Sequence, residues 1–394
     1  MKFVGIDIGS DKHFVAVVGE EGEVVTKATG FEETAEGYEK LIGLLGEPAN
    51  VLVAMEATGH YWQNLFARLA GLGFRIALLN PVRTARFAEE EMRRTKTDAL
   101  DALGIARFAQ QKRPVVAPVP EEAALELREL VRMRDRLVQD LGDRVRQLHR
   151  IVDLGFPEFT RVFKDLSSEL ATGILSRFPT ARAFEGVSEG ELANLRCGRY
   201  TVGRAKAKEI LVLAKRSVGA HHGPAYRMQA EYACEDIATL RGRIKKLEGD
   251  ISGTLDRHEI GKLLTTIDGI GDTTAARLIA ELGDITEFAS ADAIASYVGV
   301  VPGLKQSGKR TGQRAGLAHI GHATLRAKLW MPTPAAVRKN LWLKAFYDRL
   351  IARGKLPKVA LAAALRKLLH AVYSVAKNRR PFVPRLPSLA EVPT

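Results

Sequence analysis

Residues 3–28 have the sequence FVGIDIGSDKHFVAVVGEEGEVVTKA. Apolar residues alternate with others in the first two runs, 3–8 and 13–18, and a third short run follows at 23–28. Turns rich in glycine and charged residues separate the runs, which is the pattern of a three-stranded antiparallel meander.

The segments that follow the meander alternate between helical and strand patterns. We predict strands at 51–55 and 74–79, and helices at 35–45, 61–70, 81–91 and 98–111. A meander followed by β–α units implies an α/β domain with a mixed sheet and helices on its faces.

The rest of the chain is expected to be mainly helical. A Pro/Val-rich linker at 114–120 precedes leucines and valines that recur at threes, fours and sevens over 127–152. This narrow apolar seam predicts a long helix, either a coiled-coil arm or an ordinary bundle helix. We therefore expect domains at 1–113, 114–260 and 261–380, and a disordered, proline-rich tail at 381–394.

The composition is that of a folded protein rather than a disordered chain. Of the 394 residues, 46% are hydrophobic and 27% are charged. We find no unbroken apolar run of the ~18 residues that a membrane span needs, and Asp7 comes too early for a signal peptide. Cys197 and Cys234 form neither a disulfide framework nor a zinc set. We expect a cytoplasmic protein without a membrane partner.

The positive charge is concentrated at one end of the sequence. Residues 301–394 contain nineteen Lys and Arg against Asp348 and Glu391, a net charge of +17, whereas the net charge of the whole chain is +13. This field points to a polyanion partner, most simply nucleic acid, although a solvated basic face is the alternative.

Four carboxylates are placed where a metal site would form. Asp7 ends the alternation of the first strand, Glu56 directly follows the strand at 51–55, and Asp98 and Asp101 are spaced to share one face of a helix. Carboxylate clusters suit Mg²⁺ or Mn²⁺. Two such ions ~3.5–4 Å apart promote phosphodiester displacement.

Two further motifs lie in the last third of the chain. Gly269 and Gly271 precede a helix that runs through Leu282, in a helix-hairpin-helix pattern whose turn amides can bind phosphate. Ser307 lies in a polar, glycine-flanked loop between Lys305 and Lys309. A single loop serine is ordinarily inert, and the composition of this loop does not change that.

Three segments carry a resemblance to a known family. GIDIGSDK (5–12), MEATGHY (55–61) and KTDALDA (96–102) resemble the DEDD transposases of the IS-one-ten group of insertion sequences. The resemblance continues at 297–310, where QSGK is similar to the segment with the family's nucleophilic serine, and at 345–360.

The resemblance implies an N-terminal RuvC-like domain with a ribonuclease-H fold, a helical arm and a C-terminal transposase domain. It implies that Asp7, Glu56, Asp98 and Asp101 hold two Mg²⁺ or Mn²⁺ ions. It also implies that Ser307 attacks DNA and forms a covalent serine–DNA intermediate, so that DNA is cut and rejoined without a nucleotide cofactor.

The same resemblance implies the partners. These are donor and target DNA, a structured bridge RNA, and further copies of the chain in a tetramer built as a dimer of dimers. The expected location is the cytoplasm of a prokaryote, in association with the nucleoid. We expect nucleic acid to contact Lys305, Lys309, Arg310, Arg314, Gly269 and Gly271.

The sequence departs from the family at two places and leaves other functions open. His319-Ile320 replaces a common basic pair, and Pro332 and Pro334 interrupt a segment that is commonly helical. The alternatives are a metal-dependent junction endonuclease without strand transfer and a non-catalytic nucleic-acid-binding protein. An actin-like sugar kinase shares the first strand and turn, but no later segment matches its second phosphate loop.

Overall fold

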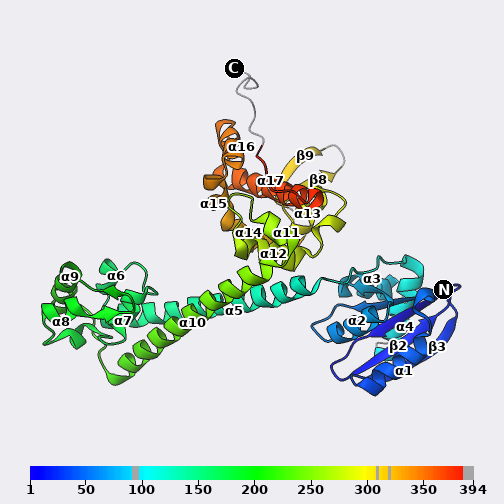
Figure 1. Cartoon of the computed structure of the whole chain (residues 1–394), viewed down its shortest axis with the longest axis horizontal. Helices are drawn as coiled ribbons and strands as arrows, with labels where there is room; N and C mark the ends of the chain where they lie inside the picture. Colours follow the sequence, from blue (N-terminus) through cyan, green and yellow to red (C-terminus); the bar gives the residue numbers. More distant parts are fainter. Residues whose placement is uncertain (91–96, 308–309, 318–320, 385–394) are drawn as a thin grey trace. The chain divides into compact units, whose positions relative to one another are not determined.

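The chain forms two compact units, Met1–Val119 and Pro120–Thr394, each with its own hydrophobic cores (Figure 1). The computed structural model describes residues 1–90, 97–307, 310–317 and 321–384, with the backbone alone at 303–307 and 310–317.

A five-stranded mixed sheet forms the centre of the N-terminal unit. Its strands are β1 (Lys2–Asp7), β2 (Lys12–Val18), β3 (Val24–Glu32), β4 (Val51–Glu56) and β5 (Arg75–Leu79). In the order β3-β2-β1-β4-β5, the first three strands are antiparallel, and β4 and β5 run parallel to β1. The predicted meander, the two later strands and the α/β class are confirmed.

Helices cover both faces of this sheet. They are α1 (Ala35–Leu45), α2 (Trp62–Gly71), α3 (Pro81–Glu90) and α4 (Asp98–Lys112), with a short 3-10 helix η1 (Pro48–Asn50). Alternate residues of β1 separate the faces, because Val4 and Ile6 pack with α1 and α2, whereas Phe3 packs with α3 and α4. The order and layering fit a ribonuclease-H-like domain.

The chain leaves this unit through an extended linker. The Ala117 N–H donates to the Ile76 carbonyl oxygen at 2.7 Å, so the linker's first half stays attached to β5. The compact unit therefore runs to Val119, a few residues beyond the boundary expected at 113.

Two long helices, α5 (Glu122–Gly155) and α10 (Pro224–Asp256), pack antiparallel in the second unit (Figure 1). Val131 of α5 shares a core with Leu255 of α10, and Leu148 of α5 shares another with Ala233. The apolar seam predicted at 127–152 thus has a partner helix from the same chain.

A small helical lobe, residues 156–223, connects α5 to α10. It contains α6 (Phe159–Val162), α7 (Glu169–Leu175), η2 (Ala181–Phe184), α8 (Glu189–Asn194), β6 (Arg196–Cys197), β7 (Tyr200–Thr201) and α9 (Arg204–Lys215). Stacked and edge-on phenylalanines, among them Phe156, Phe159 and Phe184, fill its core.

The C-terminal domain, residues 257–384, is mainly helical. Its elements are α11 (Glu259–Leu264), α12 (Asp272–Leu282), η3 (Ile285–Glu287), α13 (Ala291–Val298), β8 (Pro302–Ser307), β9 (Arg310–Leu317), α14 (Ala323–Trp330), α15 (Pro332–Lys339), α16 (Leu341–Ala352) and α17 (Pro357–Asn378). Pro332 divides one helical stretch into α14 and α15, since proline is accepted at the first position of a helix but not in its interior. The tail predicted at 381–394 lies outside the described residues from position 385 onward.

One helix of the described chain, α17, is long and apolar enough to pass a membrane-span test by length and composition. Half of its apolar window is buried inside the domain, where Leu365, Leu369 and Val372 join the core. Such a helix is the core helix of a folded domain, and it is not evidence for a membrane span.

Candidate functional site

Asp7 and Glu56 end neighbouring parallel strands at the same edge of the sheet. Ile6 pairs with Met55, so Asp7 and Glu56 follow side by side in the same register. Adjacent strands lie ~4.8 Å apart. Alternate residues of a strand point to the same face of the sheet. Asp7 therefore shares a face with Phe3, and Glu56 shares a face with Leu52. Both of these apolar residues belong to the core under α3 and α4. The two acids therefore belong to the face that α3 and α4 cover.

The helix α4 runs antiparallel to β1 across that face. Its C-terminal end lies at the beginning of β1, because the Arg113 guanidinium stands 4.8 Å from the centre of the Phe3 ring. Its middle crosses Gly5, where an added Cβ would stand 2.2 Å from both the Ala102 carbonyl oxygen and the Ala106 nitrogen. The first turn of α4 therefore points toward the strand end that carries Asp7.

That first turn carries the other two predicted acids. The Thr97 hydroxyl caps the helix by accepting from the Leu100 N–H at 3.3 Å, which fixes its start at Asp98. Asp98 is exposed and Asp101 is half-buried. Acidic side chains also stabilise the N-terminal end of a helix, where the helix dipole is positive. This effect accounts for part of the placement of Asp98 and Asp101.

Sequence reasoning missed a residue that contacts Glu56. The Thr84 hydroxyl of α3 donates to Glu56 Oε1 at 2.5 Å, and the Thr58 hydroxyl lies 3.5 Å from Glu56 Oε2. Thr84 is buried, and its hydroxyl is also 2.9 Å from the Pro81 carbonyl oxygen. The sequence signal for this role is weak: a threonine near the start of the predicted helix that follows the strand at 74–79.

A buried histidine holds the loop that follows Asp7. His13 is fully buried, its Nδ1 accepts from the Gly9 N–H at 3.2 Å, and its Nε2 lies 2.6 Å from Glu33 Oε2. The Asn64 side-chain amide donates to the other oxygen of Glu33 at 3.2 Å. The turn also requires glycine at position 9, because a Cβ there would stand 2.3 Å from the Lys12 carbonyl oxygen.

The chemistry of these four acids fits a hard divalent cation, since all the side-chain donors are carboxylate oxygens. Within the described residues, no three His, Cys, Asp or Glu side chains already stand together at metal-ligand spacing. The assignment of a shared metal site thus rests on donor chemistry and on placement at one sheet edge.

Ser307 lies in a different unit from the four acids. The predicted loop position is wrong for its backbone, because Ser307 is the last residue of β8 and pairs with Arg310 of β9. Lys305 pairs with Gln313, and Leu304 with Arg314. Lys309 and His319-Ile320 lie outside the described residues.

The helix-hairpin-helix pattern corresponds to α11, a turn and α12. Gly269 has a φ of 97°, and an added Cβ would stand 2.3 Å from the Ala336 Cα of α15, so close packing accounts for this glycine. Gly271 is the N-cap of α12, and nothing lies within 4 Å of the Cβ position there. Open space at Gly271 leaves room for a phosphate, whereas Gly269 faces the protein.

A buried ion-pair cluster joins the arm to this domain and was also missed. Arg277 of α12 is 8% exposed and donates to both oxygens of Asp135 on α5, at 2.6 and 2.7 Å. The Lys328 amine of α14 lies 3.3 Å from the same carboxylate. Burial alone would raise the pKa of Asp135, but the hydrogen bonds from Arg277 and the two positive charges outweigh it and lower that pKa.

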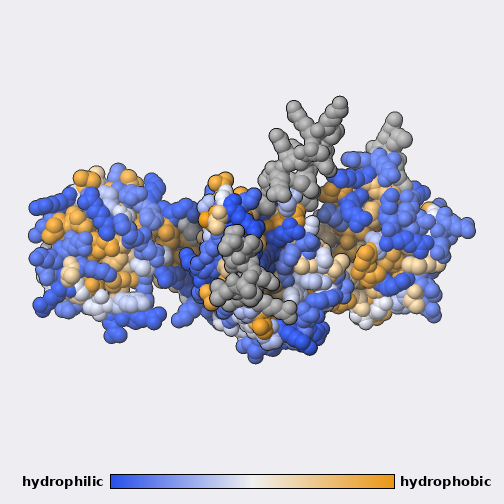
Figure 2. Space-filling view, turned by 90° about the horizontal axis from the view of Figure 1, so that it is seen from above, coloured by the Kyte–Doolittle hydropathy of each residue, from blue (hydrophilic) through white to orange (hydrophobic). Residues whose placement is uncertain are grey.

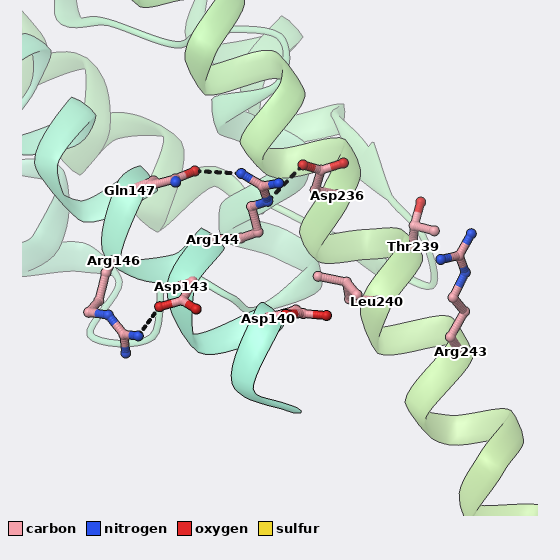
Figure 3. A pocket seen from close by; sticks show the side chains of 9 residues that line it. All are labelled: Asp140, Asp143, Arg144, Arg146, Gln147, Asp236, Thr239, Leu240 and Arg243. Atoms are coloured by element: carbon pink, nitrogen blue, oxygen red, sulfur yellow. Dashed lines mark hydrogen bonds and ion pairs between the residues drawn. The ribbon is translucent and has the colours of Figure 1, made fainter. Parts of the chain in front are cut away.

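A hollow of about 630 Å³ lies between α5 and α10 (Figure 3). Several of its charged groups are paired: the Arg144 guanidinium lies 3.0 Å from Asp236 and donates to Gln147 at 2.9 Å, and Arg146 pairs with Asp143. A hollow lined mainly by charged side chains is unlike the apolar pockets that hold small molecules. The Arg144–Asp236 pair instead links α5 to α10.

Comparison with family models gives two matches. Residues 4–157 match a DEDD model of the IS110 type, described as "Transposase", and this range contains all four acids. Residues 261–348 match the model described as "Transposase IS116/IS110/IS902 family", and this range contains Ser307.

Curated relatives are similar over most of their length. A Streptomyces clavuligerus protein, "Insertion element IS116 uncharacterized 44.8 kDa protein", is 25% identical over 98% of this chain and 97% of its own. The "Pilin gene-inverting protein" of Moraxella bovis is 24% identical over 84% and 82%. The "Transposase for insertion sequence element IS1111A" of Coxiella burnetii is 22% identical over 89% and 84%. With a DEDD domain at one end and the second transposase domain at the other, the chain belongs to the IS110/IS116 family of insertion-sequence transposases.

Proposed function

We propose that this transposase cuts and rejoins DNA through a covalent bond between Ser307 and a DNA phosphate, assisted by Asp7, Glu56, Asp98 and Asp101. The observation that supports the proposal is the side-by-side position of Asp7 and Glu56 on the sheet face that α4 crosses. The first turn of α4, which contains Asp98 and Asp101, is directed toward the end of β1. DNA transposition and DNA processing follow from the family itself.

The reaction is a pair of phosphoryl transfers. In the first, Ser307 Oγ loses its proton and bonds to a DNA phosphorus, while the bond from that phosphorus to one sugar oxygen breaks and a sugar hydroxyl is released. In the second, a sugar hydroxyl of another strand attacks the same phosphorus and releases the serine. The number of phosphodiester bonds is unchanged, so no nucleotide is hydrolysed.

A DEDD domain implies divalent metal use. We assign two Mg²⁺ or Mn²⁺ ions to Asp7, Glu56, Asp98 and Asp101. When bound, such ions activate an attacking oxygen and stabilise a leaving oxygen. Thr84 would orient one Glu56 oxygen through its hydrogen bond, and Thr97 would hold the start of α4 in place.

Ser307 and the acids belong to two separate compact units, so the reaction needs them to meet on DNA. A serine supplied by one copy and acids supplied by another would satisfy this need. We therefore propose a homo-oligomer, a tetramer built as a dimer of dimers, as the active form.

The nucleic-acid contacts are assigned to the basic C-terminal quarter. Lys305, Arg310 and Arg314 belong to the hairpin that carries Ser307, and Lys309 lies between Ser307 and Arg310 in the sequence. We further propose that a structured bridge RNA pairs with donor and target DNA, which leaves charge and shape recognition to the protein. Gly271 at the start of α12 is the candidate for a phosphate contact.

The alternative of a junction endonuclease would use the acids without Ser307. Similarity to a pilin gene-inverting protein favours rejoining, because a gene that is inverted has to be joined again. The expected location is the bacterial cytoplasm, at the nucleoid.

Recombination of a DNA substrate that carries the element ends, with the purified chain and its RNA, tests the proposal. Asp101→Asn should abolish product formation in Mg²⁺, whereas Glu39→Gln, an exposed change on α1 at the opposite sheet face, should leave it unchanged. Full activity of Asp101→Asn, or activity of the unchanged chain in a metal chelator, would contradict the metal assignment.

A further inference from the structure

A second basic surface lies on the helical lobe, far from the C-terminal quarter in the sequence. Residues 196–216 contain seven Lys and Arg against Glu209 alone, although the first 300 residues as a whole carry a net negative charge. The preceding part of the lobe, residues 156–195, contains four basic and six acidic residues. The positive charge of the lobe is thus confined to the β6–β7 hairpin and α9. The seven residues are Arg196, Arg199, Arg204, Lys206, Lys208, Lys215 and Arg216.

Three of these cations form a stripe along α9. Arg204, Lys208 and Lys215 are spaced by four and seven residues, so they share one side of the helix. All three are exposed, whereas Ala207 and Ile210 are fully buried in the lobe core. The packed side and the charged side of α9 are therefore distinct. Figure 2 shows hydrophilic residues along the rim of the lobe at the left of the view.

None of the seven cations forms an ion pair within the part of the chain that the structure describes. Two arginines of the arm, by contrast, do form ion pairs: Arg134 with Glu248 at 2.6 Å and Arg144 with Asp236 at 3.0 Å. Unneutralised like charges repel one another, and they are typical of a surface that binds a polyanion.

The hairpin adds an exposed aromatic ring to the charged surface. Tyr200 is 49% exposed, and the Arg199 guanidinium stands 5.6 Å from the centre of its ring. Cys197 holds the hairpin in place, since it is buried against Gly173, where an added Cβ would stand 2.5 Å from the Cys197 sulfur. An aromatic ring on a fixed hairpin beside cations is the arrangement that stacks unpaired bases and binds their phosphates.

The lobe is separate from the domain that carries Ser307. The two hydrophobic cores lie at opposite ends of the α5–α10 pair, and the stretch of α5 from Val131 to Leu148 spans ~25 Å. A nucleic acid bound to the lobe would therefore occupy a surface distinct from that of the C-terminal domain. From this geometry we infer that the β6–β7 hairpin and α9 form a second nucleic-acid surface, which binds the backbone and unpaired bases of a single-stranded segment.

Salt-dependent binding of labelled single strands and duplexes to the full chain tests this inference. The triple variant Arg204→Ala/Lys208→Ala/Lys215→Ala should lower the log–log salt slope for single strands by about two, at ~0.7 per phosphate contact. A control with the same net charge is Arg132→Ala/Arg146→Ala/Arg182→Ala, which removes arginines that pair with acids three positions away. This control should keep the slope. An unchanged slope in the α9 triple variant, or an equal loss in the control, would overturn the inference.

The hairpin is tested by a single change with a conservative partner. Tyr200→Ala should weaken the binding of single-stranded DNA or RNA by about tenfold, as expected for one stacked base, and should leave duplex binding unchanged. Tyr200→Phe keeps the ring and should retain full affinity, which also excludes a folding defect at this position. Equal weakening of single-strand and duplex binding would contradict recognition of unpaired bases. Binding does not require strand cleavage, so these outcomes are independent of the roles proposed for Asp101 and Ser307.

Discussion

Asp7 and Glu56 stand at the ends of adjacent parallel strands, one position beyond the paired residues Ile6 and Met55 and on the sheet face that α4 covers. Carboxylates on neighbouring strands, whose backbones lie ~4.8 Å apart, repel each other unless a cation or a hydrogen-bond donor intervenes. Glu56 accepts a hydrogen bond from the Thr84 hydroxyl, and a divalent cation would offset the repulsion between the two acids.

The approach of α4 to β1 depends on the missing side chain of Gly5. Gly5→Ala should destabilise the N-terminal unit by about 1–3 kcal/mol, because its Cβ would overlap the backbone of Ala102 and Ala106. Thermal unfolding measures this loss. Gly43→Ala is the matched control, since Gly43 lies within α1 with open space around its Cβ position, and it should stabilise the unit by roughly 0.5–1 kcal/mol. Equal melting temperatures for the two variants would show that α4 does not rest on β1 as described.

Thr84 should affect catalysis more than folding. Thr84→Val removes the hydroxyl that donates to Glu56 and costs about 1 kcal/mol of stability for the lost hydrogen bonds. Because Glu56 would then lose its orientation, a higher Mg²⁺ concentration should be needed for half-maximal recombination. Thr84→Ser retains the hydroxyl donor and should need the same Mg²⁺ concentration as the unchanged chain. A Thr84→Val variant with an unaltered Mg²⁺ titration would make Thr84 a purely structural residue.

The Asp135 cluster should make the attachment of the arm sensitive to acid. The pKa of Asp135 in the folded chain lies below its ordinary value of about 3.9, so its charged form stabilises the fold at neutral pH. That contribution is complete above the ordinary value and disappears as the pH falls through the lower, folded value. Stability measured by denaturant unfolding should therefore fall below pH ~4 in the unchanged chain.

Removing the carboxylate should expose the cost of the buried Arg277. Asp135→Ala leaves Arg277 without its bidentate partner and should lower stability at pH 7 by about 3 kcal/mol. Its stability should also vary less with pH below 4 than that of the unchanged chain. An exposed ion pair supplies the comparison: Asp348→Ala, which breaks the pair with Lys344 on α16, should cost less than about 0.5 kcal/mol.

The middle of the arm is the candidate surface for self-association. Met133 and Val138 of α5 are 45% and 38% exposed, although α10 already covers the seam. Met133→Glu/Val138→Glu should reduce the molar mass measured by light scattering without changing helix content, because neither side chain belongs to a core. An unaltered molar mass would place the contact between copies elsewhere.

The local patterns predicted much of the N-terminal unit. Alternating apolar residues predicted its strands because a half-buried sheet imposes a period of two. The contacts of Thr84 and of the Asp135–Arg277 pair were not predictable, because each joins residues that are distant in sequence. The extent of α10 was also missed, since its buried positions include small residues such as Ala230 and Ala233 that produce a weak apolar pattern.

Covalent capture of DNA tests the central proposal most directly. Mixed with substrate DNA, RNA and Mg²⁺, the unchanged chain should form a protein–DNA adduct that survives denaturation and that mass spectrometry assigns to Ser307. Ser307→Ala should bind DNA and form no adduct, whereas Ser296→Ala, an exposed serine of α13 in the same domain, should form it normally. An adduct of normal yield in Ser307→Ala, or one assigned to another residue, would contradict the account.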